Sequence, residues 1–396
     1  MKQISRIASV IKTSATLKVD ALYKQMKADG IDVVGFGAGE PDFDTPDHIK
    51  EAAYKAIRDG QTKYTPSNGI PILRQAAADR LLADLGVKYT ANQIVIASGA
   101  KHNIYVALRV LIEQGDEVIL PAPYWVTYAE AIKMVGGVPV IVYAPETRDF
   151  KITKEQLEAA VTDKTKLLII NNPSNPTGML YNAEELSALM DVCVKHDLYI
   201  ISDEIYYQLV YDGRKFTSIA ALSEDVKERA VIVNGVSKTY AMTGWRIGYA
   251  AANARIAEVM GNYLSHSTSS PSTISQLAAI EALRGSQDSI FVMRDEYEQR
   301  RNYIVERINA IEGVSCRKPE GAFYVMLNIE KLIGRKLGGR VINSSDDFTL
   351  AFLESGLVAV VSCTGFGCDN NVRLTYATSM ETISEGMDRL ERFIRG

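Results

Sequence analysis

The chain is short of the residues that build metal, disulfide and nucleic-acid sites. It has four cysteines and four histidines among 396 residues, and neither set shows the spacing of zinc ligands or of a redox CxxC motif. The net charge is only −4, and no block of like charges offers a patch for nucleic acid or an anionic membrane. We therefore expect reduced, structural cysteines, no bound metal and a small-molecule ligand.

Long apolar runs are also missing. No stretch approaches the roughly 20 apolar residues that a membrane-spanning helix needs. The first twelve residues have neither the continuous apolar core nor the small-residue cleavage site of a secretory signal. These absences favour a cytoplasmic protein that binds neither membranes nor nucleic acids.

The chain does contain a series of short, β-branched apolar runs separated by helical patterns such as 103–113 and 183–195. With 47% hydrophobic residues, it is long enough for a large core and for more than one domain. The alternation is typical of an α/β fold with a mostly parallel sheet between helices. Seven strands are expected in this sheet: 94–97, 117–120, 138–142, 167–170, 198–201, 231–233 and 247–251.

The residue pattern changes after Ser286, where charged residues with apolar residues at helical spacing replace the alternation of strand-like and helical segments. The elements expected there are a long helix, two short strands and a final helix: 290–311, 323–327, 357–361 and 380–394. We therefore predict a second, smaller α+β domain. The expected parts of the chain are an N-terminal arm with part of the small domain, a large cofactor-binding domain and a small C-terminal domain: 1–45, 46–285 and 286–396.

Lys238 is the strongest single candidate for chemistry. It follows the apolar run 231–233, with Gly235 before it and Arg246 after it. A lysine at the carboxyl end of a buried strand loses hydration and can become a nucleophile toward a carbonyl. A surface lysine in a loop is the ordinary alternative, which the neighbouring residues make the weaker one.

Ligands of an open α/β sheet bind beyond the carboxyl ends of its strands, so the polar residues at those ends are informative. The run 94–97 leads into the turn 98–101 and then into a helix. Such a turn aims backbone N–H groups at an anion such as phosphate. It is not a Walker A loop, and plain packing of a small-residue turn is the alternative.

Two more strands end in polar residues. One leads into the segment NNPSNPTG, which contains Asn175, and the next leads into Asp203 and Tyr206. A capped turn explains Asn175 alone, and a helix cap explains Asp203 alone. Together with Lys238, however, these residues follow three successive strands, so they can converge on one crevice.

An anion cup, a buried acid, a phenol and a desolvated lysine match the needs of pyridoxal phosphate. The lysine would bond to its aldehyde, the acid would keep its pyridine nitrogen protonated, and the turn would hold its phosphate. The segment 35–39 looks faintly like a dinucleotide fingerprint, but the residues after it do not open a helix. Neither NAD nor a metal is implied.

Three other side chains suit the same site. Arg246 has the planar fork that fits phosphate. Arg373 lies in a strand-like run, where an unpaired guanidinium would be costly, and a structural ion pair is its alternative. Trp125, one of two tryptophans, would stack on a planar cofactor, with core packing as its alternative.

Six segments, in this order and spacing, resemble the class I/II aminotransferases of pyridoxal-phosphate fold type I. They are AGEPDFDTP (38–46), KYTPSNGIPILR (63–74), NNPSNPTG (171–178), SDEIY (202–206), SKTYAMTGWRIGY (237–249) and VRLTYA (372–377). The similarity covers essentially the whole chain. It is greatest to the bacterial aspartate aminotransferases that lack an arginine for the distal carboxylate.

The resemblance implies pyridoxal 5′-phosphate as cofactor and a role for each matching residue. Lys238 would form the covalent link and move a proton between the substrate Cα and the cofactor C4′. Asp203 would pair with the pyridinium nitrogen, and Tyr206 would donate to the phenolic oxygen. The remaining cofactor contacts would be Gly99, Ala100, Lys101, Trp125, Asn175, Ser237, Arg246 and, from a second subunit, Tyr64. The substrate α-carboxylate would be bound by Gly39, Trp125, Asn175 and Arg373.

The resemblance also implies a homodimer with shared active sites and a ping-pong exchange between aspartate and 2-oxoglutarate. No arginine or lysine lies between Arg255 and Arg284, so Lys101 is the candidate for the distal carboxylate, with Ser14 and Thr16 lining the pocket. Lys101 could instead serve the phosphate end or solvent. The loop 362–366 departs from the family pattern, which keeps prephenate and aromatic amino donors open.

Three other functions stand as alternatives. A lyase of the same fold would use Lys238, Asp203 and Arg373 but eliminate a group, and it would not consume 2-oxoglutarate. A non-catalytic regulator that senses the cofactor would need a DNA-binding module, for which we expect no room before the first motif. An unrelated nucleotide-binding α/β protein would form no reducible adduct on its lysine.

Overall fold

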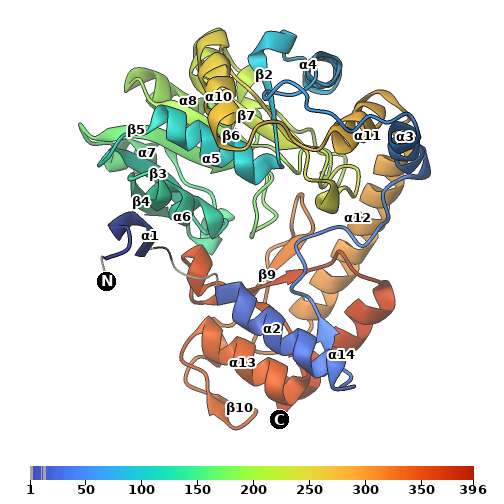
Figure 1. The fold of residues 1–396 in the computed structure, drawn as a ribbon. Helices are drawn as coiled ribbons and strands as arrows, with labels where there is room; N and C mark the ends of the chain where they lie inside the picture. The colour runs from blue at the N-terminus through green and yellow to red at the C-terminus, as the bar shows by residue number, and fades with distance from the viewer. Residues whose placement is uncertain (1–2, 10, 12–14) are drawn as a thin grey trace.

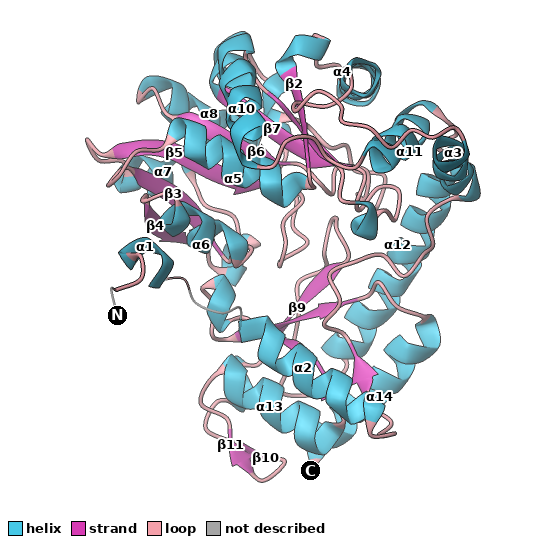
Figure 2. Ribbon diagram, in the orientation of Figure 1, coloured by secondary structure: helices cyan, strands magenta, loops and turns pink. Residues whose placement is uncertain are grey.

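The computed structural model describes residues 3–9, 11 and 15–396, and its central feature is a seven-stranded sheet (Figure 1, Figure 2). The strand order is β2-β8-β7-β6-β5-β3-β4. β8 runs antiparallel to both of its neighbours, and the other pairs are parallel. The seven strands are β2 (Ile94–Ala97), β3 (Glu117–Ala122), β4 (Val138–Tyr143), β5 (Thr165–Asn171), β6 (Tyr199–Asp203), β7 (Ala230–Gly235) and β8 (Gly248–Ala251). The prediction of a mostly parallel α/β sheet is confirmed.

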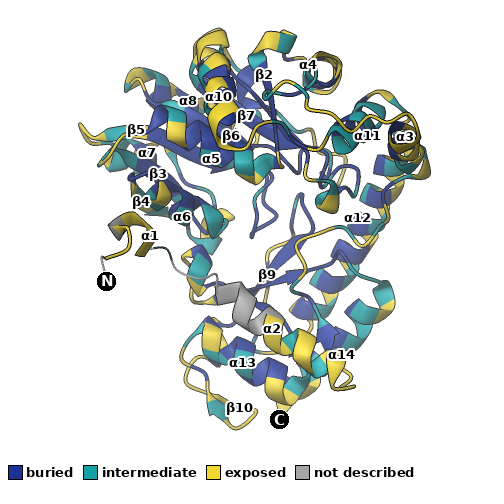
Figure 3. Cartoon of the chain, viewed as in Figure 1, coloured by how far each residue is buried: buried dark blue, intermediate teal, exposed yellow. Residues whose placement is uncertain are grey.

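Both faces of most of this sheet are buried, which explains the continuous apolar character of those strands, whereas the edge strand β4 is partly exposed (Figure 3). In β2, Ile94 and Ile96 join the core on one face, whereas Val95 and Ala97 join the core on the other. The first core includes residues of α3 (Asp47–Arg58), α4 (Pro71–Leu85), α7 (Lys154–Ala160), α8 (Ala183–Lys195), α9 (Glu224–Arg229) and α11 (Thr273–Arg284). The second includes residues of α5 (Ala100–Leu111), α6 (Thr127–Met134) and α10 (Ala254–Ser267).

Local signals set where two of these helices begin. α8 starts where predicted, because Asn182 and Glu185 form a reciprocal capping box with bonds of 2.8 Å in both directions. The predicted helix 103–113 instead begins at Ala100, directly after Gly99, whose φ of 90° is accessible to glycine. Gly99 has no side chain to cap the helix, so the first N–H groups of α5 are left for a ligand.

The C-terminal part forms a second body with its own core (Figure 1). A three-stranded antiparallel sheet, β13-β14-β9, packs with helices and with two small strand pairs. The elements are α12 (Asp288–Asn309), β9 (Tyr324–Asn328), β10 (Lys336–Leu337), β11 (Arg340–Val341), α13 (Ser345–Gly356), β12 (Val358–Ala359), β13 (Val361–Ser362), β14 (Asn371–Thr375) and α14 (Met380–Arg395). The N-terminal elements are α1 (Arg6–Ser9), α2 (Ala15–Ala28) and β1 (Val34–Gly35), and β1 pairs with β12. The predicted division at 45/46 and 285/286 stays a prediction.

One predicted strand of this part is wrong. The run 357–361 is not a single strand but two, interrupted at Val360. β12 pairs in parallel with β1, whereas β13 pairs antiparallel with β14. Both halves are buried, so their apolar pattern alone does not reveal that the chain changes partner between them.

Several features are absent from the part of the chain that the structure describes. None of its helices combines the length and the apolar content needed to cross a bilayer. Its histidine, cysteine and acidic side chains form no cluster of three or more able to hold a metal ion. All four cysteines are buried, and none of these described residues forms a disulfide.

The contact between β8 and the turn before α5 yields a stability prediction. A Cβ at Gly248 would lie 2.2 Å from the backbone nitrogen of Ala100. Gly248→Ala should therefore destabilise the fold by about 1–3 kcal/mol, since backbone atoms must move to accept the methyl group. Urea denaturation measures this, with Gly244→Ala as the matched control, because a Cβ at Gly244 meets nothing within 4 Å. Equal midpoints for the two variants would contradict the prediction.

Candidate active site

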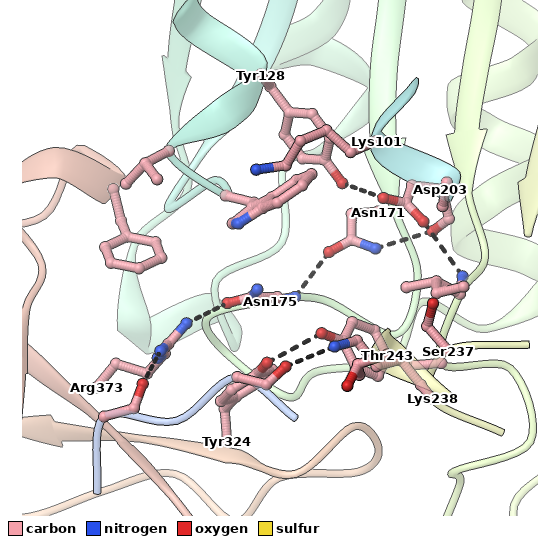
Figure 4. Close-up of a pocket in the computed structure, with 18 of the residues that line it drawn as sticks. Lys101, Tyr128, Asn171, Asn175, Asp203, Ser237, Lys238, Thr243, Tyr324 and Arg373 are labelled. Atoms are coloured by element: carbon pink, nitrogen blue, oxygen red, sulfur yellow. Dashed lines mark hydrogen bonds between the residues drawn. The ribbon is translucent and has the colours of Figure 1, made fainter. Parts of the chain in front are cut away.

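A cavity of about 390 Å³ lies at the carboxyl ends of β5, β6 and β7 (Figure 4). Polar residues that follow these strands meet there with residues of the C-terminal sheet. The predicted site residues that line it are Gly39, Ala100, Lys101, Trp125, Asn175, Asp203, Tyr206, Ser237, Lys238, Arg246 and Arg373. The expected convergence of strand ends on one crevice is therefore observed.

Four predicted residues are not among those that line the cavity. Tyr64 is 97% exposed in the single chain. Ser14 lies outside the described residues, and the side chain of Thr16 is likewise outside the description. Gly99 lies next to the lining residue Ala100 and forms the turn before α5.

Lys238 lies on the turn after β7 and is partly buried. Its Nζ donates a hydrogen bond to the carbonyl oxygen of Gly39. Loss of hydration is the largest cause of a fall in the pKa of Lys238 to about 8. The charge of Glu40 acts against this fall, whereas Arg246 and Arg373 add to it. A substantial fraction of the amine is therefore neutral near physiological pH, as a nucleophile or base requires.

Asp203 ends β6 and is only 4% exposed. Burial raises the pKa of its carboxyl to about 6, while hydrogen bonds and the charge of Lys238 act in the opposite direction. The Tyr128 hydroxyl donates to Oδ2 at 2.7 Å, and the backbone N–H of Ile205 donates to Oδ1 at 3.2 Å. The carboxylate is therefore mostly ionised at neutral pH, and it faces the cavity as a buried negative charge.

The turn between β2 and α5 forms an anion cup together with Arg246. The Arg246 guanidinium donates to the carbonyl oxygens of Thr243 at 2.8 Å and of Ser98 at 3.3 Å. A Cβ at Gly99 would lie 2.4 Å from Arg246 Nη2, so the arginine packs directly on the glycine backbone. The amides at the start of α5 and the guanidinium are thus adjacent, as phosphate binding requires.

Arg373 stands on β14 and is 6% exposed. Its guanidinium donates to Asn175 Oδ1 at 3.0 Å and to the Gly37 carbonyl oxygen at 3.1 Å. The rings of Tyr324 and Phe366 lie 4.4 and 5.3 Å from its Cζ. In the part of the chain described here, these contacts include no carboxylate, so the structural ion pair considered as an alternative is not found. A buried cation without a counter-charge favours an anionic ligand.

Lys101 lies at the mouth of the cavity, with its Nζ 4.8 Å from the centre of the Trp125 ring. Partial loss of hydration lowers the pKa of Lys101, and the charge of Arg246 lowers it further. Lys101 and Arg373 are the two cations of the cavity whose proposed roles concern the substrate.

Sequence reasoning missed several residues of this site. Asn171 ends β5, and its Nδ2 donates to the Asp203 carbonyl oxygen at 2.8 Å, so the rule of polar strand ends could have found it. Tyr128 follows Trp125 by three residues and carries no distinctive signal. Tyr324 and Phe366 reach the cavity from the C-terminal part, and only the folded chain reveals this approach.

The residues present fit pyridoxal 5′-phosphate. The buried carboxylate of Asp203 has an environment suited to a pyridinium nitrogen. The turn at Gly99 has no Cβ, which would collide with the Arg246 guanidinium, so this cation stays beside the first amides of α5. Among the described residues, the buried Nε of Arg373 has no hydrogen-bond partner, which leaves a donor free for a ligand. An amine, a carboxylate and two anion-binding groups are therefore available around one cavity.

Comparisons with known proteins agree with this chemistry. The family description "Aminotransferase class I and II" matches residues 31–390. Aspartate aminotransferase from Geobacillus stearothermophilus is 49% identical over 100% of this chain and 99% of its own length. Aspartate/prephenate aminotransferase from Cereibacter sphaeroides is 44% identical over the full length of both chains. The structure of Thermus thermophilus aspartate aminotransferase with maleate has a TM-score of 0.93 and 38% identity, over 99% of this chain and 100% of that one. The chain belongs to the class I and II aminotransferases.

Proposed function

We propose that this protein transfers the amino group of aspartate to 2-oxoglutarate with pyridoxal 5′-phosphate as cofactor. The observation that carries the proposal is that a desolvated Lys238, a buried Asp203 and Arg373 line one cavity, and that Arg373 contacts no carboxylate among the described residues. The full-length similarity to proteins named aspartate aminotransferase supports the choice of donor.

Cofactor binding is proposed for residues from four parts of the cavity. Bound pyridoxal 5′-phosphate supplies an aldehyde that condenses with amines and a protonated ring that accepts the electron pair left at the substrate Cα. Asp203 holds the proton of the ring nitrogen, and Tyr206 with Asn175 donates to the phenolic oxygen. The phosphate is bound by the amides of Gly99, Ala100 and Lys101, with Ser237 and Arg246, while Trp125 stacks on the ring.

Substrate binding and proton transfer are proposed for a second set. Arg373 binds the α-carboxylate, with Asn175 and the backbone of Gly39 beside it. Lys238, as a neutral amine, takes the proton from the substrate Cα and delivers it to the C4′ carbon of the cofactor. Its lowered pKa of about 8 suits both directions of this transfer.

The distal carboxylate is proposed to bind Lys101, at the mouth of the cavity. Ser14 and Thr16 complete this end in the proposal. Prephenate is the second candidate acceptor, because one relative of 44% identity is named an aspartate/prephenate aminotransferase. The aromatic rings of Trp125 and Phe366 in the cavity lining are compatible with such a substrate.

A homodimer with shared active sites is also proposed, in which Tyr64 of one subunit reaches the phosphate of the other. The exposure of Tyr64 in the single chain supports this, since a large aromatic side chain is rarely left 97% exposed. Sedimentation that finds only monomers in a fully active preparation would refute this assembly.

Replacement of Lys238 tests the reaction itself. Lys238→Ala should lower turnover of aspartate with 2-oxoglutarate by more than roughly 10⁴-fold, because the variant loses both the nucleophile and the base. Circular dichroism should show an unchanged fold. Lys227→Ala, at a lysine paired with Glu224 on α9, is the matched control and should keep its activity. Ordinary turnover by Lys238→Ala would end the assignment.

Replacement of Tyr128 tests the role of Asp203 through pH. The ionised carboxylate binds the ring nitrogen, so cofactor affinity is full above the Asp203 pKa of about 6 and falls below it. Tyr128→Phe removes a hydrogen bond that lowers this pKa, so its affinity should begin to fall at a higher pH. Cofactor dissociation constants measured from about pH 5.5 to 8 check the shift.

Lys238 titrates both in Tyr128→Phe and in the unmodified chain. The difference between their pH curves therefore reports on Asp203. Tyr124→Phe removes a neighbouring phenol whose side chain does not line the described cavity, and it should behave like the unmodified chain. Superimposable pH curves for Tyr128→Phe and the unmodified chain would contradict the proposed ionisation.

Replacement of Lys101 tests the substrate. Lys101→Ala should raise KM for aspartate by roughly 10–100-fold, the value of one charge-assisted hydrogen bond. KM for alanine, which has no distal carboxylate, should change little, and Lys101→Arg should keep part of the preference for aspartate. Steady-state assays with both amino donors decide this. An aspartate KM that is indifferent to Lys101→Ala would refute the proposed specificity.

A further inference from the structure

Tyr324 is a buried residue of the cavity wall to which the proposed function gives no role (Figure 4). It stands on β9, in register with Thr375 of the neighbouring strand β14. Its hydroxyl lies 3.0 Å from the hydroxyl of Tyr206, a proposed cofactor ligand. Its ring faces the guanidinium of Arg373, the proposed substrate ligand. Tyr324 therefore contacts both a proposed cofactor ligand and the proposed substrate ligand.

The two phenols share one hydrogen bond, and its direction matters. Each hydroxyl has a single hydrogen to donate. If Tyr206 donated to Tyr324, it would have no hydrogen left for a ligand. If Tyr324 donates to Tyr206, the Tyr206 hydrogen is free to point into the cavity, while the Tyr206 oxygen still has its hydrogen bond.

The surroundings favour donation by Tyr324. Burial raises the pKa of both phenols, but the charge of Arg373 is the largest opposing influence on Tyr324. The negative charge of Asp203 raises the pKa of Tyr206 further, and Arg373 opposes this only as the smallest influence. At Tyr324 the smallest influence is Glu40, which raises the pKa. The more acidic phenol of such a pair is the better donor.

Packing holds the Tyr324 hydroxyl in this position. A Cβ at Gly39 would lie 3.3 Å from it, so the Gly39 backbone leaves little free space on that side. The ring of Phe323 packs edge-on against Tyr206 at 5.5 Å between centroids. Among the described residues, Tyr206 is the hydrogen-bond partner of Tyr324.

We propose that Tyr324 is a positioning residue that donates to the Tyr206 oxygen and so directs the Tyr206 hydrogen toward the phenolic oxygen of the cofactor. The inference rests on the proposed function, because it needs that oxygen to lie beside Tyr206. A residue of the C-terminal part thereby sets the donor strength of a cofactor ligand on the seven-stranded sheet body. If Tyr324 had only a structural role, its replacement would change stability and leave the properties of the bound cofactor unaltered.

The test is Tyr324→Phe, which keeps the ring on Arg373 and removes only the hydroxyl. Apoprotein reconstituted with pyridoxal 5′-phosphate should bind it about 3–10-fold more weakly, the value of one hydrogen bond. The pH at which the absorbance of the bound cofactor changes should rise by about 0.5–1 unit. The phenolic oxygen loses donor strength from Tyr206, so its negative charge is less stabilised and the cofactor holds its proton to a higher pH.

Tyr376→Phe is the matched control. It also removes one buried hydroxyl in the same part of the fold, where Tyr376 donates to the Ala322 carbonyl oxygen at 3.3 Å. Tyr376 does not line the described cavity. This variant should lose stability comparable to that lost by Tyr324→Phe, while its cofactor affinity and absorbance transition stay those of the unmodified protein.

A double-mutant cycle identifies the route of the effect. In a Tyr206→Phe background, Tyr324→Phe should produce no further shift of the absorbance transition, because its action passes through Tyr206. An additive shift in that background, or no shift in the single variant, would overturn the proposal. If Tyr324→Phe fails to fold, fluorotyrosine at position 324 provides the opposite test. Its more acidic phenol should move the transition to lower pH, and an unchanged transition would count against the inference.

Failure of the inference can be told apart from failure of the proposed function. An unmodified protein that binds the cofactor and transaminates, with Tyr324→Phe indistinguishable from it, refutes the role of Tyr324 alone. An unmodified protein that forms no absorbing adduct with the cofactor refutes both.

Discussion

The removal of charged groups from water at the carboxyl edge of the sheet is the constraint on which the site depends. Burial at this edge lowers the pKa of the Lys238 amine to about 8 and raises that of the Asp203 carboxyl to about 6. Both values bring the groups toward neutral pH, where one can move a proton and the other can hold a charge. The seven-stranded sheet creates this environment, because helices pack on both of its faces and the cavity lies at the strand ends.

The cavity is completed by a second body of the fold, which supplies an arginine proposed to bind an anion. Arg373 and Tyr324 stand on neighbouring strands of the C-terminal sheet, and Phe366 comes from a loop of the same part. The guanidinium reaches back to Asn175 and Gly37, so groups proposed to bind the substrate and the cofactor share hydrogen bonds. A ligand that spans the cavity therefore contacts both bodies, and its binding energy depends on how they are held together.

Much of the fold could be read from the sequence because both faces of the large sheet are buried. Continuous β-branched runs such as 94–97 have no other stable place in a chain of this length, and all seven predicted strands exist. The same argument failed at 357–361, where a buried run changes partner at Val360 and becomes two strands. Periodicity reports burial, but it carries no information on which strand lies alongside. Tyr128 and Tyr324 were not predicted from the sequence for a related reason. Tyr128 contacts Asp203 and Tyr324 contacts Tyr206, and both partners are distant in sequence.

The sequence by itself determined the chemical groups and their order: a lysine, an acid and a small-residue turn, each directly after an apolar run, and an arginine within another. Local rules suffice for this, because strands end where the apolar run ends and ligands gather at that edge. Only the tertiary structure decided how these groups behave. The pKa of Lys238 depends on lost hydration and on four charges brought to it by folding. Among the described residues Arg373 has no carboxylate contact, and this follows from what the folded chain places around it. Solvation and long-range contacts are properties of the packed molecule, so no stretch of sequence contains them.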